Sequence, residues 1–207
     1  MCHHVIPLQL ADLEQALANQ KATGRARISG AGHAPDAYPG KQLPLFVVGD
    51  AGELTTCELT WGFEAPEHVP QKLVFNTRLD TALRHARSGR GMWAQALERG
   101  RCLLPVRAFF ESWTRQPPSK GAEVRFDMNG HGVFLLAAVQ EAGRFSIVTV
   151  DPGQTVGRYH TRMPLVLGPG ESNVWLGPSF ADLSNRSDIP LVATPAEGAS
   201  AQQTLAI

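Results

Sequence analysis

From residue 101 onward, the chain is a succession of short apolar segments separated by turns, and this feature restricts the possible folds most. The segments are rich in valine, isoleucine, leucine and phenylalanine, and glycine or proline lies between most of them. Such segments favour strands, whereas glycine and proline favour the turns that join strands. Short helices are expected around 171–177 and 180–185. The predicted strands of this half are 101–106, 108–113, 123–128, 133–140, 144–150, 163–167 and 189–194.

The first hundred residues contain both helices and strands. Apolar positions at helical spacing predict an amphipathic helix over 8–20, and a second helical section covers 79–89 and 92–100, where Gly100 is a plausible stop. The remaining predicted elements are a loop at 29–44 and strands at 45–49, 53–63 and 72–76. Strands outnumber helices and do not alternate with them. This pattern favours an α+β fold with a mainly antiparallel sheet, curled toward a barrel and flanked by helices.

Length and composition fit a single domain over residues 1–207. A hydrophobic content of 43% and a charged content of 18% are typical of a globular chain. No apolar run approaches the roughly 18 residues of a membrane span. No basic segment followed by an apolar stretch marks a secretory signal at the N-terminus. We therefore expect a cytoplasmic protein with no membrane partner, and a monomer.

Cysteines and arginines restrict the possible ligands. Three cysteines without CxxC spacing argue against a disulfide framework or a structural zinc site, so no metal or cofactor is expected. The net charge is zero, but seven of the 15 arginines lie between Arg78 and Arg107, opposed there only by Asp80 and Glu98. Arginine makes bidentate contacts with phosphate. This stretch is therefore a candidate nucleic-acid surface, with a solvated helix face as the ordinary alternative.

Cys2 directly follows the initiator methionine. Removal of Met1 gives this residue a free α-amine and a thiol on adjacent carbons, a pair that no internal residue offers. On its own, the position has a simpler explanation, because a small second residue allows the methionine to be removed.

Three later stretches each place polar residues in apolar surroundings. The stretch VFNTRLDT carries Asn76 and Arg78, AFFESW carries Glu111, and RYHTRMPLVL carries His160 and Arg162. Each residue alone has an ordinary structural explanation as a turn, an exposed side chain or a satisfied core histidine.

Taken together and in order, these stretches resemble the SOS response-associated peptidase (SRAP) family. The matching segments are MCHH at the N-terminus, NTRLDT, RCLLPVRAFFESW and HTRMP, and TWGF and VWL resemble two further family segments. The resemblance extends from residue 2 to about residue 176. The chain departs from the family pattern at His3 and His4, where the family has Gly-Arg, and at Arg107, Ala108 and Ser112.

The resemblance implies a sensor and shield of abasic sites in single-stranded DNA. An abasic sugar in its open form exposes an aldehyde. The α-amine of Cys2 would form a Schiff base with it, and the thiol would close a thiazolidine ring, a step favoured because it is intramolecular. The peptidase activity of the family name would then be the removal of Met1 from the protein itself.

The resemblance also implies roles for individual residues. Asn76 would orient the Cys2 backbone, Glu111 would donate and accept protons, and His160 would assist proton transfer near the sugar and its phosphate. The expected DNA contacts are phosphate pairing by Arg78 and Arg162 and base stacking by Trp61 and Phe63, for which core burial is the alternative.

Three other functions remain open from the residues alone. One is an amidohydrolase that uses its N-terminal cysteine as nucleophile. Another is a non-catalytic protein that binds single-stranded nucleic acid, which the His3-His4 substitution and the zero net charge favour. The third is Cu(II) or Ni(II) binding by the terminal amine and His4, which is the third residue once Met1 is absent.

Overall fold

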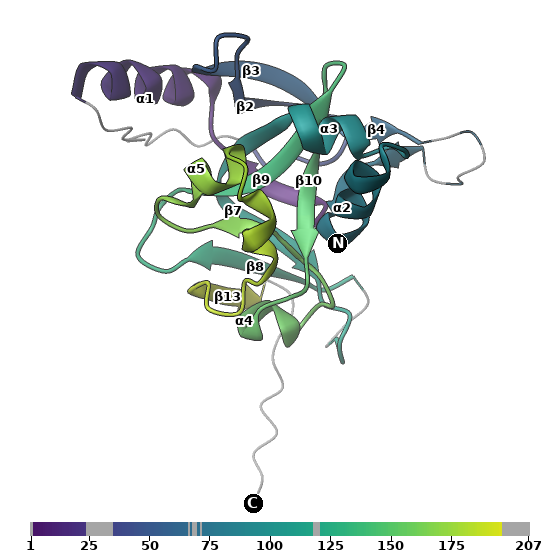
Figure 1. The fold of residues 1–207 in the computed structure, drawn as a ribbon. Coiled ribbons are helices and arrows are strands. Elements are labelled where there is room, and N and C mark those ends of the chain that lie inside the picture. Colours follow the sequence, from purple (N-terminus) through teal and green to yellow (C-terminus); the bar gives the residue numbers. More distant parts are fainter. Residues whose placement is uncertain are drawn as a thin grey trace, which may run out of the picture.

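The computed structural model describes residues 2–23, 35–65, 67, 70, 72–117 and 121–195. Within them, eleven strands form one sheet, and five of these strands close into a barrel (Figure 1). Around the barrel the order is β9, β10, β3, β2 and β7, and β7 pairs again with β9. The barrel strands are β2 (Gln42–Val48), β3 (Leu54–Trp61), β7 (Arg101–Ser112), β9 (Phe134–Glu141) and β10 (Arg144–Val150). Closure leaves this part of the sheet without an open edge.

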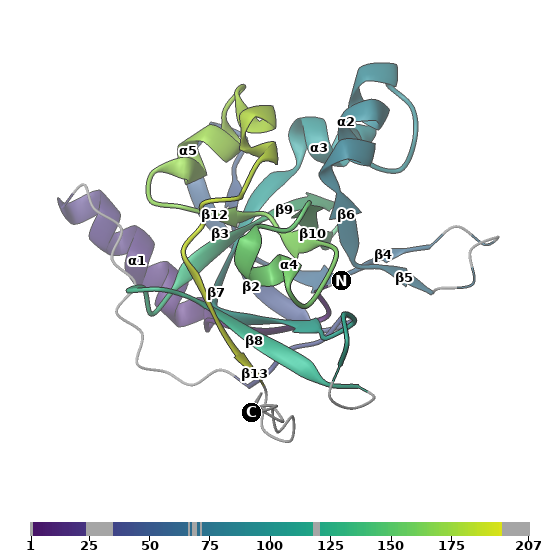
Figure 2. The same cartoon turned by 90° about the horizontal axis from the view of Figure 1, so that it is seen from below.

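The long strand β7 extends the sheet beyond the barrel. Its first half, Arg101–Val106, pairs with β9, and its second half pairs with β1 (His4–Pro7) on one side and with β8 (Glu123–Met128) on the other. The register with β1 skips Arg107, because Ile6 faces Ala108 and Pro7 faces Val106. Such a bulge bends a strand and redirects its side chains. The outer half of β7 thus forms a separate platform with β1, β8 and β13 (Leu191–Pro195), which is visible in Figure 2.

Shorter strands and helices complete the described fold. The short strands are β4 (Phe63–Glu64), β5 (Leu73–Val74), β6 (Asn76–Arg78), β11 (Met163–Pro164) and β12 (Val166–Leu167). The helices are α1 (Leu10–Thr23), α2 (Leu79–Ser88), α3 (Ala94–Arg99), α4 (Gln154–Gly157), α5 (Glu171–Leu176) and the 3₁₀ helix η1 (Phe180–Ser184). None of the helices in the described ranges is long and apolar enough to cross a lipid bilayer.

Arg101 attaches two of these helices to the barrel. Its guanidinium donates hydrogen bonds to the carbonyl oxygens of Leu97 (2.6 Å) and Trp175 (2.9 Å), and it lies 4.2 Å from the centre of the Phe180 ring. One arginine of the predicted basic stretch is therefore a structural residue that satisfies carbonyls at the ends of α3 and α5.

The predicted α+β fold with a mainly antiparallel sheet curled into a barrel is confirmed. The predicted strands 123–128 and 144–150 coincide with β8 and β10, and the segments 101–106 and 108–113 form the one strand β7. The predicted loop 29–44 lies partly outside the described residues, and its end belongs to β2. The strand β1 and the one-turn helix α4 were not predicted. The assignment of residues 1–207 to a single domain stays a prediction.

Trp61 and Phe63 lie in the core. The Trp61 indole is completely buried, donates a hydrogen bond to the carbonyl of Phe75 (3.0 Å) and stacks on Phe145 at 6.2 Å. Phe63 packs edge to face on Trp93 at 5.2 Å. Neither ring is placed to stack on a nucleotide base, so the prediction of DNA contacts for these two residues is corrected.

Truncation of Trp61 is expected to destabilise the barrel. Trp61→Ala removes a fully buried side chain, so the free energy of unfolding should fall by roughly 3–5 kcal/mol. Val48→Ala on β2, at a side chain that is 44% exposed, should change it by less than about 0.5 kcal/mol. Urea denaturation followed by circular dichroism measures both, and equal effects would contradict a core role for Trp61.

Candidate active site

Cys2 lies two residues before β1 and is completely buried. Its carbonyl oxygen accepts a hydrogen bond of 2.8 Å from Nδ2 of Asn76. Asn76 begins β6, which pairs in parallel with β10 at Ile147, so the barrel wall fixes its position. The other side-chain atom of Asn76, Oδ1, is buried and has no hydrogen-bond partner within the described ranges. The amide therefore anchors the Cys2 backbone to the barrel wall.

Glu111 lies beside Cys2 on the outer half of β7. Its side chain has no exposed surface, and the backbone of Cys2 forms a hydrogen bond with it. Nδ1 of His160 lies 3.6 Å from Oε2 of Glu111. His160 comes from the segment between α4 and β11, and its Nδ1 is 3.1 Å from the backbone nitrogen and 3.0 Å from the carbonyl oxygen of Arg162. The Arg162 amide can donate to Nδ1 when this nitrogen is unprotonated, and the Arg162 carbonyl can accept from Nδ1 when it carries the proton. The backbone of Arg162 thus holds the ring in either tautomer.

The structure therefore brings four of the predicted site residues together. The contacts run from Asn76 to Cys2, from Cys2 to Glu111, and from Glu111 to His160. These residues come from four separate segments of the chain, which the closed barrel and its outer platform place side by side.

Burial dominates the electrostatics of this group. It raises the pKa of Glu111 from its ordinary value of 4.5 to about 7, against the hydrogen bond from the Cys2 backbone, which lowers it. Burial lowers the pKa of His160, which favours the neutral imidazole. Burial, followed by the charge of Glu111, raises the pKa of the Cys2 thiol. At neutral pH both forms of the Glu111 carboxyl are populated, as a group that donates and accepts protons requires.

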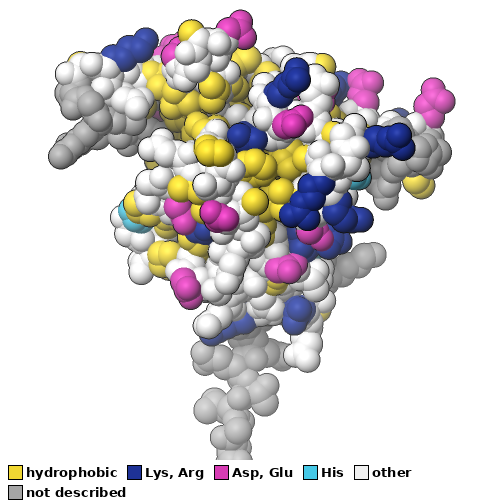
Figure 3. Space-filling model, viewed as in Figure 1, with side chains coloured by type: hydrophobic (Ala, Val, Ile, Leu, Met, Phe, Trp, Pro, Cys, Tyr) yellow, Lys and Arg dark blue, Asp and Glu magenta, His cyan; other side chains and the backbone are white. Residues whose placement is uncertain are grey.

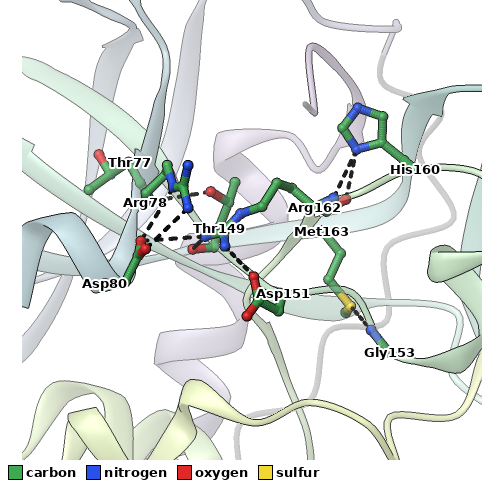
Figure 4. A network of polar contacts seen from close by, with 9 residues as sticks. All are labelled: Thr77, Arg78, Asp80, Thr149, Asp151, Gly153, His160, Arg162 and Met163. Carbon is green, nitrogen blue, oxygen red and sulfur yellow. Dashed lines mark hydrogen bonds and ion pairs between the residues drawn. The ribbon is translucent and has the colours of Figure 1, made fainter. Parts of the chain in front are cut away.

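The two predicted phosphate ligands occupy different environments (Figure 4). Arg162 is only 11% exposed; its guanidinium contacts Asp151 at 2.6 Å and the carbonyl of Thr149 at 2.8 Å, and it lies 3.8 Å from Asp80. Arg78 is 55% exposed and pairs with Asp80 at 3.1 Å. Arg162 therefore joins β10 to the beginning of α2, and Arg78 is the more accessible of the two guanidinium groups.

Further exposed arginines lie on and after α2. Arg84, Arg87 and Arg90 are all exposed, and Figure 3 shows basic side chains gathered over this part of the molecule. The helix α2 follows directly on β6, whose first residue, Asn76, holds the Cys2 carbonyl. The exposed arginines thus come, along the chain, soon after the residue that anchors Cys2.

The contacts of His4 bear on the alternative of metal binding at the terminus. Within the described ranges, no group of three or more His, Cys, Asp or Glu side chains is placed to hold a metal ion. His4 lies in the extended strand β1, with Nδ1 3.3 Å from Glu123 and Nε2 2.8 Å from Asp36. An amine–imidazole chelate would require His4 to leave both carboxylates. The prediction did not include Glu123 and Asp36, because neither follows a recognisable motif.

The fold and the four assembled residues define a small β-barrel protein with a cysteine-centred site beside a basic helix. The profile of the family "SOS response associated peptidase (SRAP)" matches residues 1–203, and the chain belongs to this family.

Named relatives resemble the chain in sequence, and solved structures resemble it in fold. The abasic site processing proteins YoqW and YobE of Bacillus subtilis (strain 168) are each 24% identical over 67% of this chain. The matches span 64% and 66% of those proteins, just under two thirds of their length. A phage-related protein from Bordetella bronchiseptica is 20% identical and has a TM-score of 0.68, covering 95% of this chain and 94% of its own. A protein from Bacteroides thetaiotaomicron is 18% identical with the same TM-score, covering 95% and 93%.

Glu111 is expected to reduce stability as the pH rises. Between pH 4.5 and 7 the folded protein retains a proton that the unfolded chain loses, so rising pH favours unfolding until the folded form has also ionised. Glu111→Gln removes this dependence. Its free energy of unfolding relative to wild type should increase by about 3 kcal/mol from pH 4 to pH 8. Urea titrations across this range measure the difference, and a constant difference would contradict the raised pKa.

Proposed function

We propose that this protein senses abasic sites in single-stranded DNA and shields them by covalent capture at Cys2. The observation that carries the proposal is the convergence of Asn76, Glu111 and His160 on a buried cysteine next to the initiator methionine. Membership of the SRAP family and the similarity to abasic site processing proteins support abasic sites as the substrate.

The chemistry begins with hydrolysis of the Met1–Cys2 peptide bond. This single cleavage would account for the word "peptidase" in the family name. The freed α-amine attacks the C1′ aldehyde of the open sugar to give a carbinolamine. Loss of one water leaves an imine, and the Cys2 sulfur then adds to the imine carbon while its proton moves to the nitrogen. The product is a five-membered thiazolidine, and the capture of the aldehyde releases one water.

Each neighbouring residue has a role in these steps. Glu111, with a pKa of about 7, gives a proton to the departing hydroxyl and regains one from the amine nitrogen as the imine forms. It then relays the proton of the thiol, whose own pKa is raised, to that nitrogen. The Asn76 amide holds the Cys2 carbonyl, so that the amine and the thiol stay on the side of Glu111. His160, held by the Arg162 backbone, exchanges protons with Glu111.

DNA approaches along the basic surface of α2. Arg78 lies two residues after Asn76 and is exposed, so it is the guanidinium best placed to contact a phosphate beside the captured sugar. Arg162 contributes by holding Asp80 and the His160 segment in place.

Covalent capture is tested with single-stranded DNA that carries one abasic site. Wild type should form an adduct that survives denaturation, Cys2→Ala should form none, and Glu111→Gln should be slower by about 100-fold. Cys57→Ala, at a half-buried thiol on β3, is the matched control and should react like wild type. Denaturing gels give the rates, and intact mass reports whether Met1 has been removed.

The competing functions give different outcomes in the same assay. DNA binding without any adduct would identify a non-catalytic binding protein. Hydrolysis of small amides by the protein lacking Met1, again without an adduct, would identify an amidohydrolase. An adduct that Cys2→Ala also forms would contradict the proposed mechanism.

Arg78 is expected to contribute one phosphate contact. Arg78→Ala should weaken binding of single-stranded DNA and reduce the slope of log K against log salt by about 0.7, the value for one contact. Lys21→Ala on α1, far from α2 in Figures 1 and 2, removes the same charge and should leave the slope unchanged. Fluorescence anisotropy at several salt concentrations measures both slopes. Equal slopes for the two variants would contradict a phosphate contact of Arg78.

A further inference from the structure

A series of alternating charges lies between the candidate site and helix α2 (Figure 4). Asp80, in the first turn of α2, accepts two hydrogen bonds from the Arg78 guanidinium, at 3.4 Å on Oδ1 and 3.1 Å on Oδ2. The same carboxylate lies 3.8 Å from Nη2 of Arg162. Nη1 of Arg162 in turn contacts Asp151 at 2.6 Å. The four side chains carry two positive and two negative charges, which cancel.

The two contacts of Asp80 are unequal. Arg78 meets both carboxylate oxygens, in the two-point geometry that arginine forms with carboxylates. The distance of 3.8 Å to Arg162 allows an ion pair but is too long for a hydrogen bond. Nε of Arg162 is buried and has no hydrogen-bond partner among the residues that the structure describes. Asp80 is therefore engaged with Arg78 and only approaches Arg162.

Space beside these groups allows the carboxylate to change partners. Asp80 and Arg162 line one cavity of about 120 Å³ between α2 and the end of β10. The Asp80 side chain is 56% exposed, so neighbouring side chains do not fix it. A displacement of about 1 Å would bring the carboxylate and the Arg162 guanidinium to the usual N···O distance of about 2.9 Å.

Arg162 connects these charges to the candidate site through its own backbone. Its amide nitrogen and carbonyl oxygen lie 3.1 and 3.0 Å from Nδ1 of His160, and this nitrogen lies 3.6 Å from Glu111. One partner of the Arg162 guanidinium is Asp151, whose side chain is 90% exposed. Ion pairs with exposed carboxylates are weak. A hydrogen bond from Asp80 would therefore hold the His160 segment more firmly.

We propose that Asp80 is a positioning residue that exchanges Arg78 for Arg162 when a DNA phosphate binds. The phosphate takes over the Arg78 guanidinium, because arginine pairs with phosphate in the same bidentate way as with a carboxylate. The released carboxylate then accepts a hydrogen bond from Arg162, and this contact holds His160 beside Glu111. The inference rests on the proposed function, in which these two residues exchange protons during capture. It makes their alignment depend on bound DNA.

Asp80 is therefore expected to affect DNA binding and covalent capture in opposite directions. Asp80→Asn keeps the shape of the side chain and removes its charge. The phosphate then displaces no carboxylate from Arg78, so the affinity for single-stranded DNA should rise about threefold. Arg162 loses its second carboxylate, so the rate of capture at saturating DNA should fall about tenfold. A residue that only stabilised the fold would not produce this combination.

Matched variants isolate the effect. Asp80→Glu retains the carboxylate and should capture DNA like wild type. Asp50→Asn removes the same charge at an exposed position in the turn between β2 and β3, and it should change neither quantity. In the Arg78→Ala background, Asp80→Asn should still slow capture but no longer raise the affinity, because the competition acts through Arg78.

Binding and capture are measured separately. Fluorescence anisotropy with single-stranded DNA that lacks an abasic site gives the affinity, and denaturing gels with DNA that carries one give the rate. Thermal melts establish that each variant is folded. An Asp80→Asn variant that binds no more tightly than wild type, or that captures as fast at saturating DNA, would overturn the proposal.

The exchange itself is read by NMR of arginine-labelled protein, through the Nε–H signal of Arg162, assigned from Arg162→Lys. DNA without an abasic site should shift this signal in wild type but not in Asp80→Asn, and a shift in both or in neither would overturn the exchange. The expected shift and affinities without any wild-type adduct would refute the proposed function and leave the exchange intact. Adducts that wild type and Asp80→Asn form at equal rates would refute the exchange and leave the function intact.

Discussion

The pairing of β1 with the outer half of β7 is the interaction on which the candidate site depends. It carries Cys2 to the side of Glu111, where the Asn76 amide fixes its carbonyl. The same pairing buries Glu111 completely and raises its pKa to about 7. Burial of a carboxyl reduces stability at neutral pH, so the proximity that provides an acid–base group also weakens the fold at that point.

Much of the fold follows from local patterns. Residues 123–128 and 144–150 were predicted exactly as β8 and β10, because each is a β-forming run bounded by turn residues. The strand β1 was not predicted, because its four residues are all buried and show no alternation. Barrel closure depends on contacts such as that of β7 with β9, and a strand's own sequence does not specify its partner.

The site shows the same division between local and distant information. Cys2, Asn76, Glu111 and His160 were identified only as an ordered set that resembles a family. An aromatic residue on a strand can face either the core or solvent, so the prediction for Trp61 and Phe63 was wrong, and the hydrogen bonds of Arg162 could not be read from its neighbours. The sequence does not indicate a role for Glu123 or Asp36, because a single acidic residue near a turn is common. Their role is visible only in the structure, where the His4 ring contacts both carboxylates.

Because of the bulge at Arg107, the number of residues between the barrel and Glu111 decides which side chain reaches the site. β7 exchanges its partners there, and the outer half must arrive with Glu111 on the inner face. Insertion of one residue would shift the alternation by one position and place Phe110 where the carboxyl lies, and deletion of one residue would place Ser112 there. An insertion or deletion of a single residue in this connection would therefore remove the acid from the reacting centre, even where every side chain of the connection is kept.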